Sequence, residues 1–422
     1  MAESLNVIAL ISGGKDSFFS ILHCIQNGHK VVALGNLYPA PTSGQEPGES
    51  PGEADGHDEH DLNSFMYQTV GHTVIPLYEQ ALQIPLYRQP IIGTAIQTAV
   101  SYSHVEQSTN NGRSRSGLES DETEDETESL VPLLKRIMAD HPTANAISTG
   151  AILSTYQRTR VESVALRLGL IPLGFLWKYP VLPPATQTSL LEDMQSVGLD
   201  ARFVKVASGG LDESFLWQNV ASGPVMRRIE KSMKRFGTDG DGAVLGEGGE
   251  FETLVIDGPP SLFKGRIEIE EEDRRIVREG GGAAWLRILK AKVVMKTSEN
   301  PEKIECRIPE LLSQRFTEVL DILKSDEQGV HTRNPTQSAN TIPISKGPAQ
   351  VEPPSEKEQL LHWTFGSEVT RSALSVTEEA SSLILDIKQN LNKASLQPSD
   401  IVSTIIVLRS MTEFAVINKV PL

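Results

Sequence analysis

The stretch Val7-Ile-Ala-Leu-Ile-Ser-Gly-Gly-Lys-Asp-Ser17, followed by Phe18-Phe-Ser-Ile-Leu22, decides the fold. Its apolar start predicts a buried β-strand, two glycines end that strand, and the apolar residues after them predict an α-helix. In such a strand–loop–helix unit, backbone N–H groups and the positive end of the helix dipole form a cradle for a phosphate group. The sequence therefore predicts a nucleotide-binding loop at residues 12–17.

The side chains of this loop predict which nucleotide chemistry it performs. The glycines let the backbone approach an anion, the serines add hydroxyl donors, and Lys15 adds a positive charge. Asp16 stands where a Walker A loop has Ser or Thr, and a carboxylate repels a phosphate unless a cation lies between them. We therefore expect Asp16 to bind Mg²⁺ and Lys15 and Asp16 to be catalytic. The alternative is a plain glycine turn with both side chains solvated. The predicted ATP-binding residues are Ser12, Gly13, Gly14, Lys15, Asp16, Ser17 and Gly150.

The complete motif Ser12-Gly-Gly-Lys-Asp-Ser17 resembles the SGGxDS signature of the PP-loop ATP pyrophosphatases. Members of that superfamily split ATP into AMP and pyrophosphate, usually by adenylating a substrate oxygen that a nucleophile then displaces. The resemblance implies an AMP-forming use of ATP.

Composition limits the class of protein. With 422 residues, of which 39% are hydrophobic, the chain is long enough for two or three domains. No apolar stretch reaches the roughly 18 residues of a membrane helix, and the N-terminus has no basic signal region, so we expect a cytoplasmic protein without a membrane partner. Cys24 and Cys306 are the two cysteines, far apart in sequence. This argues against a disulfide framework, a cysteine-held metal and sulfur transfer.

The formal charge of −16 is concentrated in two segments. Residues 40–63 hold seven acids and no Lys or Arg, and residues 105–130 hold eight acids against two arginines. Their composition predicts disordered acidic insertions near 40–62 and 106–129. The rest of the chain is close to neutral and shows no dense basic stripe, so no stable nucleic-acid binding is expected, although a local patch formed by the fold stays open.

Strands and helices alternate through residue 170, which predicts an α/β fold with a doubly wound, mostly parallel sheet. We expect a PP-loop ATP-binding domain at 1–170, a smaller α+β substrate-binding subdomain at 171–300, a helix and linker at 301–357, and a C-terminal unit at 358–422. Within the subdomain, the runs 266–277 and 285–296, joined by Glu-Gly-Gly-Gly, predict a closing hairpin.

A second polar segment follows a predicted strand at residues 144–148 and opens a helix at 155–168. It therefore lies at the same sheet edge as the phosphate loop. Gly150 permits a close backbone approach, and the substrate-binding candidates there are Tyr156, Arg158 and Arg160. The alternative is a solvated first helical turn in which Arg158, Arg160 and Glu162 form a helix-start charge pattern.

Two further groups are candidates for substrate binding. Tyr67 and His72 lie in the segment Asn63 to His72, where they could contact a substrate, although a lone histidine is more often structural. Glu247, Glu250 and Glu252 lie on a glycine-rich turn and a strand start, where carboxylates bind a cation or accept a proton from an amine. Surface acids without a role are the alternative.

Five motifs in the right order resemble the diphthine–ammonia ligase family within the PP-loop superfamily. They are Ser12 to Ser17, Ser64 to His72, Pro85 to Arg88, Gly150 to Glu162 with Leu168-Gly-Leu170 and Leu176-Trp177, and Gly246 to Asp257. The resemblance implies that ATP and Mg²⁺ are used to amidate diphthine, a modified histidine on translation elongation factor 2, with ammonium, completing diphthamide. Diphthine carries a trimethylammonium group, so an acidic or aromatic pocket is expected, with Trp217 near the glutamates.

The C-terminal residues resemble the first half of the YjgF-like deaminase fold, with a helix at 373–393 and a strand at 401–408. Larger fungal ligases of this type carry such modules, and this copy is partial, without deaminase activity expected. Two other hypotheses stay open: a tRNA-modifying PP-loop ATP pyrophosphatase, and a non-catalytic nucleotide-binding scaffold.

Overall fold

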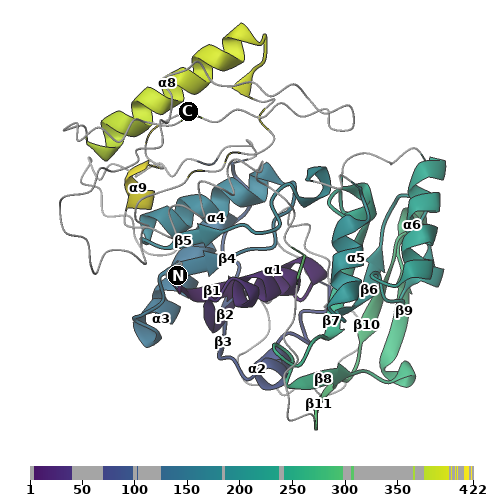
Figure 1. Cartoon of the computed structure of the whole chain (residues 1–422). Coiled ribbons are helices and arrows are strands. Elements are labelled where there is room, and N and C mark those ends of the chain that lie inside the picture. The colour runs from purple at the N-terminus through teal and green to yellow at the C-terminus, as the bar shows by residue number, and fades with distance from the viewer. Residues whose placement is uncertain are drawn as a thin grey trace, which may run out of the picture. The chain divides into compact units, whose positions relative to one another are not determined.

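The computed structural model describes residues 4–39, 70–97, 125–182, 186–236, 242–297 and 375–398, together with 102, 306, 307, 365, 401, 404, 406, 413–417 and 420. The chain divides into two compact units, Ala2–Pro309 and Glu310–Leu422, the second joined by Met1 (Figure 1). Tyr67, the insertion at 40–62 and the linker at 308–357 lie outside the described residues.

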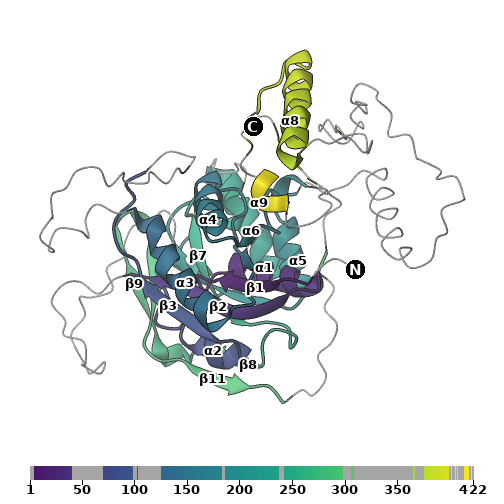
Figure 2. The same ribbon diagram turned by 90° about the vertical axis from the view of Figure 1, so that its left-hand side faces the viewer.

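A five-stranded parallel sheet with the order β3-β2-β1-β4-β5 forms the first part of the larger unit. The prediction of a doubly wound parallel sheet is confirmed, because helices cover both of its faces. Ala9 and Leu34 share a core with α1, whereas Ile8 and Ala33 share another with α3 and α4, the side seen in Figure 2. The elements are β1 (Asn6–Leu10), α1 (Lys15–Gln26), β2 (Lys30–Tyr38), α2 (Leu77–Leu82), β3 (Leu86–Pro90), α3 (Leu130–Asp140), β4 (Ala146–Ser148), α4 (Thr155–Arg167) and β5 (Ile171–Leu173).

An antiparallel sheet with the order β7-β6-β10-β9 forms the second part. The predicted hairpin pairs as expected but divides between two sheets: β9 pairs with β10, and β8 pairs with β11 in a separate two-stranded sheet. Helix α6, which the sequence analysis missed, buries Val225, Met226, Ile229 and Met233 on one face. The elements are α5 (Ser189–Ser196), β6 (Asp200–Val206), α6 (Gly223–Phe236), β7 (Phe251–Asp257), β8 (Gly265–Glu268), β9 (Arg274–Arg278), β10 (Ala284–Ile288) and β11 (Lys292–Met295).

One hydrophobic core joins the two sheets. Phe18 and Phe19 of α1 belong to the same buried cluster as Leu254 of β7 and Phe203 of β6. The ring of Phe18 lies 4.6 Å from that of Tyr78 in α2 and 5.5 Å from that of Phe263. Both sheets therefore belong to one compact unit, and the predicted boundary at residue 170 stays a prediction.

The predicted end of the second insertion is wrong. Asp125 begins a 3₁₀ turn, Glu126–Ser129, in which Glu126, Thr127 and Ser129 are buried. The Asp125 carboxylate accepts hydrogen bonds from the backbone N–H groups of Thr127 and Gln97, at 3.0 Å each. These contacts fix the residues as part of the fold, whereas 103–124 lie outside the described residues.

In the C-terminal unit, α8 (Val376–Lys393) begins with a capping box in which Ser375 and Glu378 bond each other's backbone, and α9 spans Phe414–Ile417. The helix prediction is confirmed there. Of the predicted strand at 401–408, the structure describes Ile401, Thr404 and Ile406, none of them in a strand.

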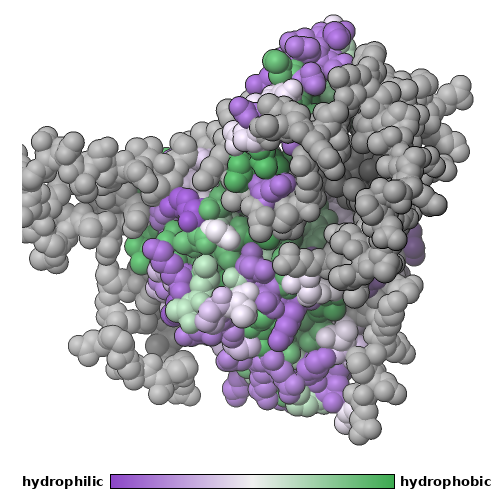
Figure 3. All heavy atoms as spheres, turned by 60° about the vertical axis from the view of Figure 1, so that its left-hand side comes forward, coloured by the Kyte–Doolittle hydropathy of each residue, from purple (hydrophilic) through white to green (hydrophobic). Residues whose placement is uncertain are grey.

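The described surface is mixed in polarity. Figure 3 shows one face, on which hydrophilic side chains are interspersed with hydrophobic surface. Ile92 and Ile96 are among the exposed apolar residues, and the chain just beyond them, 98–101, lies outside the described residues. Among the helices that the structure describes, none is long and apolar enough to span a membrane.

Candidate active site

The phosphate loop lies between the end of β1 at Leu10 and the start of α1 at Lys15. Gly13 adopts a φ of +94°, and a Cβ added there would lie 2.7 Å from Cδ1 of Ile75, so only glycine fits. The Ser17 hydroxyl donates to the carbonyl of Gly14 at 2.9 Å and closes the first turn of the helix. The predicted strand–loop–helix unit is confirmed.

Lys15 and Asp16 form a charged pair at the start of α1, in which the lysine is buried and the aspartate is partly exposed. Lys15 is 3% exposed, and its Nζ donates to Oδ2 of Asp16 at 2.8 Å and to the carbonyl of Leu245 at 2.6 Å. Burial raises the pKa of Asp16, against the attraction of the Lys15 ammonium. The carboxylate therefore sits where its charge is costly unless a cation is close.

The second sheet packs directly on the phosphate loop. Oγ1 of Thr253 in β7 accepts a hydrogen bond from the backbone N–H of Lys15 at 3.1 Å, and the N–H of Val255 donates to the carbonyl of Gly13 at 2.9 Å. Tyr78 of α2 donates through its hydroxyl to the carbonyl of Val255 at 2.6 Å. Two elements, β7 and α2, thus hold the loop. Neither Tyr78 nor Thr253 was a candidate from the sequence: Tyr78 lies outside the quoted motifs, and Thr253 lies in the Gly246 to Asp257 motif, where only the glutamates were singled out.

Gly150 brings the segment after β4 against the same loop. A Cβ at this position would lie 2.6 Å from the backbone nitrogen of Ser17 and 2.7 Å from the carbonyl carbon of Asp16. No side chain fits there without moving the start of α1. The close approach expected at Gly150 is therefore made by the backbone of Asp16 and Ser17.

Among the candidate glutamates, Glu247 interacts electrostatically with both charged side chains of the loop, Asp16 and Lys15. Its Oε2 accepts the backbone N–H of Leu153 at 2.9 Å. Burial, and next the negative charge of Asp16, raise the pKa of Glu247 to about 7. Glu250 is also buried and accepts the N–H of Gly248 at 2.9 Å, whereas Glu252 lies 3.7 Å from the Lys205 ammonium on the neighbouring strand.

The acidic side chains at the loop suit a divalent cation with oxygen ligands. Oδ1 of Asp16 is buried and has no hydrogen-bond partner among the residues described, and the carboxylate of Glu247 repels that of Asp16. Mg²⁺ commonly takes one or two carboxylates and completes its shell with phosphate oxygens and water. The described residues show no group of three or more His, Cys, Asp and Glu side chains that would hold a metal alone.

Comparison with known proteins assigns the family. A family model described as the diphthamide synthase C-terminal domain matches residues 186–294, which contain the antiparallel sheet. The human diphthine–ammonia ligase is 38% identical over 300 residues, covering 71% of this chain and 96% of the human protein. The chain belongs to the diphthine–ammonia ligase family.

Longer members of the ligase family match almost the whole chain. The Schizosaccharomyces pombe diphthine–ammonia ligase is 35% identical over 421 residues, and the Saccharomyces cerevisiae one is 29% identical over 433 residues. Each alignment covers 99% of this chain, but 61% and 55% of the respective yeast protein. The chain thus spans little more than half the length of these two relatives.

The arginines that the ligase resemblance marked have mainly local partners. Nε of Arg158 lies 2.5 Å from Oε1 of Glu162, and its guanidinium lies over the Trp177 ring. Arg160 has no exposed surface; it donates to the carbonyls of Tyr156 and Gln97. The helix-start charge pattern fits Arg158, and burial speaks for a structural role of Arg160.

Tyr156 and His72 are likewise held within the fold. The Tyr156 ring lies under the Arg160 guanidinium, with 3.2 Å between its centroid and Cζ of Arg160. The backbone carbonyl of His72 accepts Nη2 of Arg88 at 3.3 Å, and its side chain is half-buried. These contacts do not by themselves give either residue a role in ligand binding.

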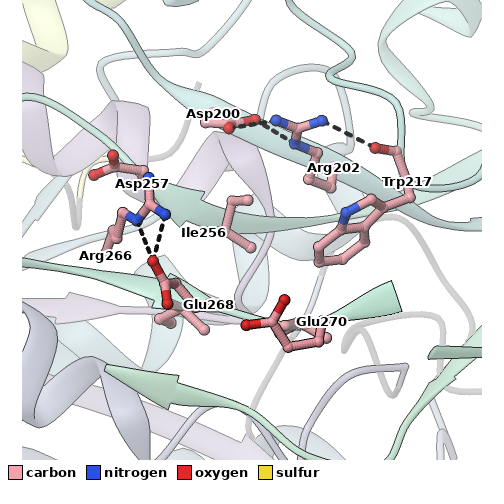
Figure 4. A pocket seen from close by; sticks show the side chains of 10 residues that line it. Asp200, Arg202, Trp217, Ile256, Asp257, Arg266, Glu268 and Glu270 are labelled. Carbon is pink, nitrogen blue, oxygen red and sulfur yellow. Dashed lines mark hydrogen bonds and ion pairs between the residues drawn. The ribbon is translucent and has the colours of Figure 1, made fainter. Parts of the chain in front are cut away.

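A cavity of about 290 Å³ lies apart from the three glutamates, between β6, β7 and β8 (Figure 4). Trp217, with an unusual φ of +64°, borders it, and the Arg274 guanidinium lies 4.6 Å from the centre of the indole. Its charged groups are paired, as between Arg202 and Asp200 at 2.6 Å. The three candidate glutamates are not among the residues that line this pocket with Trp217, and its grouping with them stays a prediction. The other lining residues are Asp200, Arg202, Ile256, Asp257, Arg266, Ile267, Glu268, Ile269 and Glu270.

Proposed function

We propose that this protein amidates the carboxylate of diphthine on translation elongation factor 2, using ATP and ammonium and releasing AMP and pyrophosphate. The main support is that the loop bearing Lys15 and Asp16 is hydrogen-bonded to a sheet whose residues match the family model of the diphthamide synthase C-terminal domain. The named relatives are diphthine–ammonia ligases, and the large share of the human protein that aligns supports the same activity here. A cytoplasmic location fits a protein substrate that works in translation.

The reaction needs positioning and charge neutralisation more than an enzyme nucleophile. A carboxylate oxygen attacks the α-phosphorus of ATP, the bond to the β-phosphate oxygen breaks, and pyrophosphate leaves. Ammonia then forms the C–N bond to the acyl carbon as AMP departs. The Lys15 ammonium and the N–H groups of the loop stabilise negative charge on the phosphates.

Two carboxylates divide the remaining work. Asp16 would hold Mg²⁺, which neutralises phosphate charge when bound. Glu247, whose pKa lies near 7, is the candidate to accept the proton that the attacking amine loses. The carbonyl of Leu245 and the Asp16 carboxylate fix the direction of the Lys15 side chain.

A product assay tests the proposal. Purified protein with ATP, ammonium and diphthine-bearing elongation factor is expected to release AMP and pyrophosphate in step with amide formation. Release of ADP, or AMP formation that does not depend on the factor, contradicts it. AMP formation that depends on added tRNA instead would support the tRNA-modifying hypothesis.

Lys15→Ala is expected to lower kcat/KM by roughly 10²- to 10³-fold, since a positive charge that acts on the transition state is lost. Lys135→Ala, on the exposed side of α3, is the matched control and should keep the wild-type rate. Thermal melting of both variants checks that they fold. A near-normal rate in a folded Lys15→Ala variant would mean that the loop is structural.

The C-terminal unit is proposed to be a YjgF-like module of the fungal type. The capped helix α8 supports this, since it matches the helix that the resemblance implies. We propose no deaminase activity for it.

A further inference from the structure

Helix α6 carries a stripe of positive charge on its exposed face. Its buried residues recur at helical spacing, and its basic residues occupy the opposite side. Arg227, Lys231 and Lys234 are spaced four and three residues apart, so they line up along the axis. We call these three side chains, with their neighbours Arg228 and Arg235, the α6 stripe; all five are exposed.

The stripe is not explained by the needs of the helix. Five basic residues and one acid, Glu230, give α6 a formal charge of +4 in a chain of −16. Like charges at i, i+4, such as Arg227 and Lys231, destabilise an isolated helix, and no acid stands in the first turn. Lys234 and Arg235, in the last turn, interact favourably with the negative end of the helix dipole, whereas Arg227, near the helix start, does not.

The charges of the stripe are largely available. Arg228 donates to Oε1 of Gln218 at 3.1 Å and to Oγ of Ser214 at 2.9 Å. For Arg227, Lys231 and Lys234, the part of the chain that the structure describes offers no ion pair or hydrogen bond.

The stripe is close to the phosphate loop in structural terms. Helix α6 packs against the 3₁₀ turn Ala243–Leu245, and Val225 and Ile229 belong to the same core as this turn. The carbonyl of Leu245 at its end accepts the Lys15 ammonium. Only one turn of chain therefore separates the helix that bears the stripe from the lysine of the active site. Figure 1 shows α6 at the margin of the unit, where a partner has access.

We propose that the α6 stripe docks an acidic surface of the protein substrate. This rests on the proposed function, which requires a folded protein to bring one side chain to the phosphate loop. Protein is favoured over RNA because the chain outside α6 has a formal charge of −20, the difference between −16 and +4, most of it in the two acidic segments, and because no second dense run of basic residues in the sequence extends the stripe. A long polyanion would extend beyond the stripe and be repelled by this negative charge. A compact acidic surface can contact the stripe without approaching the acidic segments. Phe236, 60% exposed at the end of the helix, adds the apolar area typical of protein interfaces.

Charge reversal tests the proposal. The variant combines Arg227→Glu, Lys231→Glu and Lys234→Glu, and the matched control combines Lys135→Glu, Lys388→Glu and Lys393→Glu, with the same change in net charge. The stripe variant is expected to raise both the KM and the directly measured Kd for the elongation factor roughly 10- to 100-fold. Its kcat at saturation and its Kd for ATP should match those of the control. The difference should shrink between about 50 and about 300 mM salt.

The outcomes separate docking from chemistry. Equal KM and Kd in the stripe variant and the control overturn the docking proposal, whatever the turnover. Tight binding of the factor to wild type that the stripe variant loses, with no AMP formed by either, supports docking and contradicts the proposed function. Binding of a single-stranded RNA of about 20 nucleotides that depends on the stripe, with an unchanged Kd for the factor, assigns the stripe to RNA and overturns the proposal.

Discussion

His23 shows how a side chain behind the active site sets a pH limit on the fold. It lies in α1 and is 2% exposed, and its Nε2 has no hydrogen-bond partner among the described residues. Burial lowers its pKa to about 4; the Asp193 carboxylate opposes this and the Arg307 guanidinium adds to it. Its ring packs among the aromatic rings of Phe19, Phe175 and Tyr179.

The folded protein is expected to lose stability in mild acid because of His23. In the unfolded chain its pKa is near 6.5, so between pH 6.5 and 4 the unfolded state binds more protons than the folded one. The contribution of neutral His23 to the free energy of unfolding is complete above about pH 6.5. It decreases as the pH falls and is smaller by about 2 kcal/mol at pH 5. Urea unfolding at pH 7.5 and pH 5 of wild type and His23→Gln measures it. The same pH dependence in both proteins would contradict the assignment.

At the scale of elements, the sequence predicts structure formed by neighbouring residues, but it does not predict contacts between residues far apart in the chain. The roles of Lys15 and Asp16 can be predicted from six neighbouring residues, because a phosphate loop forms from one short continuous segment. Thr253 lies 238 residues away from Lys15, and no spacing rule joins them. Helix α6 was missed because charged residues separate its few apolar residues, which the fold gathers on one buried face.

Gly150→Ala tests the contact between the segment after β4 and α1. The added methyl group would meet the backbone of Asp16 and Ser17, which has no freedom to move away. We expect a loss of about 1–3 kcal/mol in stability and weaker ATP binding. Gly174→Ala is the matched control, since its Cβ would have ordinary space, 3.9 Å from the Trp177 side chain. Thermal melts with and without ATP measure both effects, and equal melts for the two variants would speak against the contact.

The boundary of the second insertion gives a sharper deletion experiment. Removing 106–124 is expected to keep the melting temperature and turnover, whereas removing 106–129 should destabilise the protein by more than about 2 kcal/mol. The reason is that Asp125 and the buried turn after it bond Gln97, whose carbonyl in turn accepts Arg160. Chemical denaturation of the two deletions decides. Equal stability would show that the turn is dispensable.

At the scale of the whole molecule, the larger unit and the C-terminal unit are separable in principle. Residues 2–309 contain both sheets, and the human relative aligns over 96% of its length with 71% of this chain. The family could be recognised from the sequence because its motifs lie in both sheets, from Ser12 to Asp257. The packing of one sheet on the other could not be, since it depends on side chains such as Tyr78 that belong to no motif.

A chain that ends after Pro309 is expected to keep kcat/KM within about threefold of the full chain, because a compact unit with its own core does not need the rest for stability. AMP release under saturating ATP and ammonium measures this. A drop of more than about tenfold, in a truncated protein that still melts cooperatively, would give the C-terminal unit a part in catalysis.

The hydrogen bonds from Thr253 and Val255 to the phosphate loop make the two sheets a single thermodynamic unit. A nucleotide that binds the folded loop stabilises the antiparallel sheet as well, by about 2.7 kcal/mol at a hundred times its dissociation constant. Conversely, substitutions that destabilise the antiparallel sheet are expected to weaken the binding of the nucleotide. We therefore expect a thermal melt to show one transition for both sheets, and ATP to shift that transition as a whole.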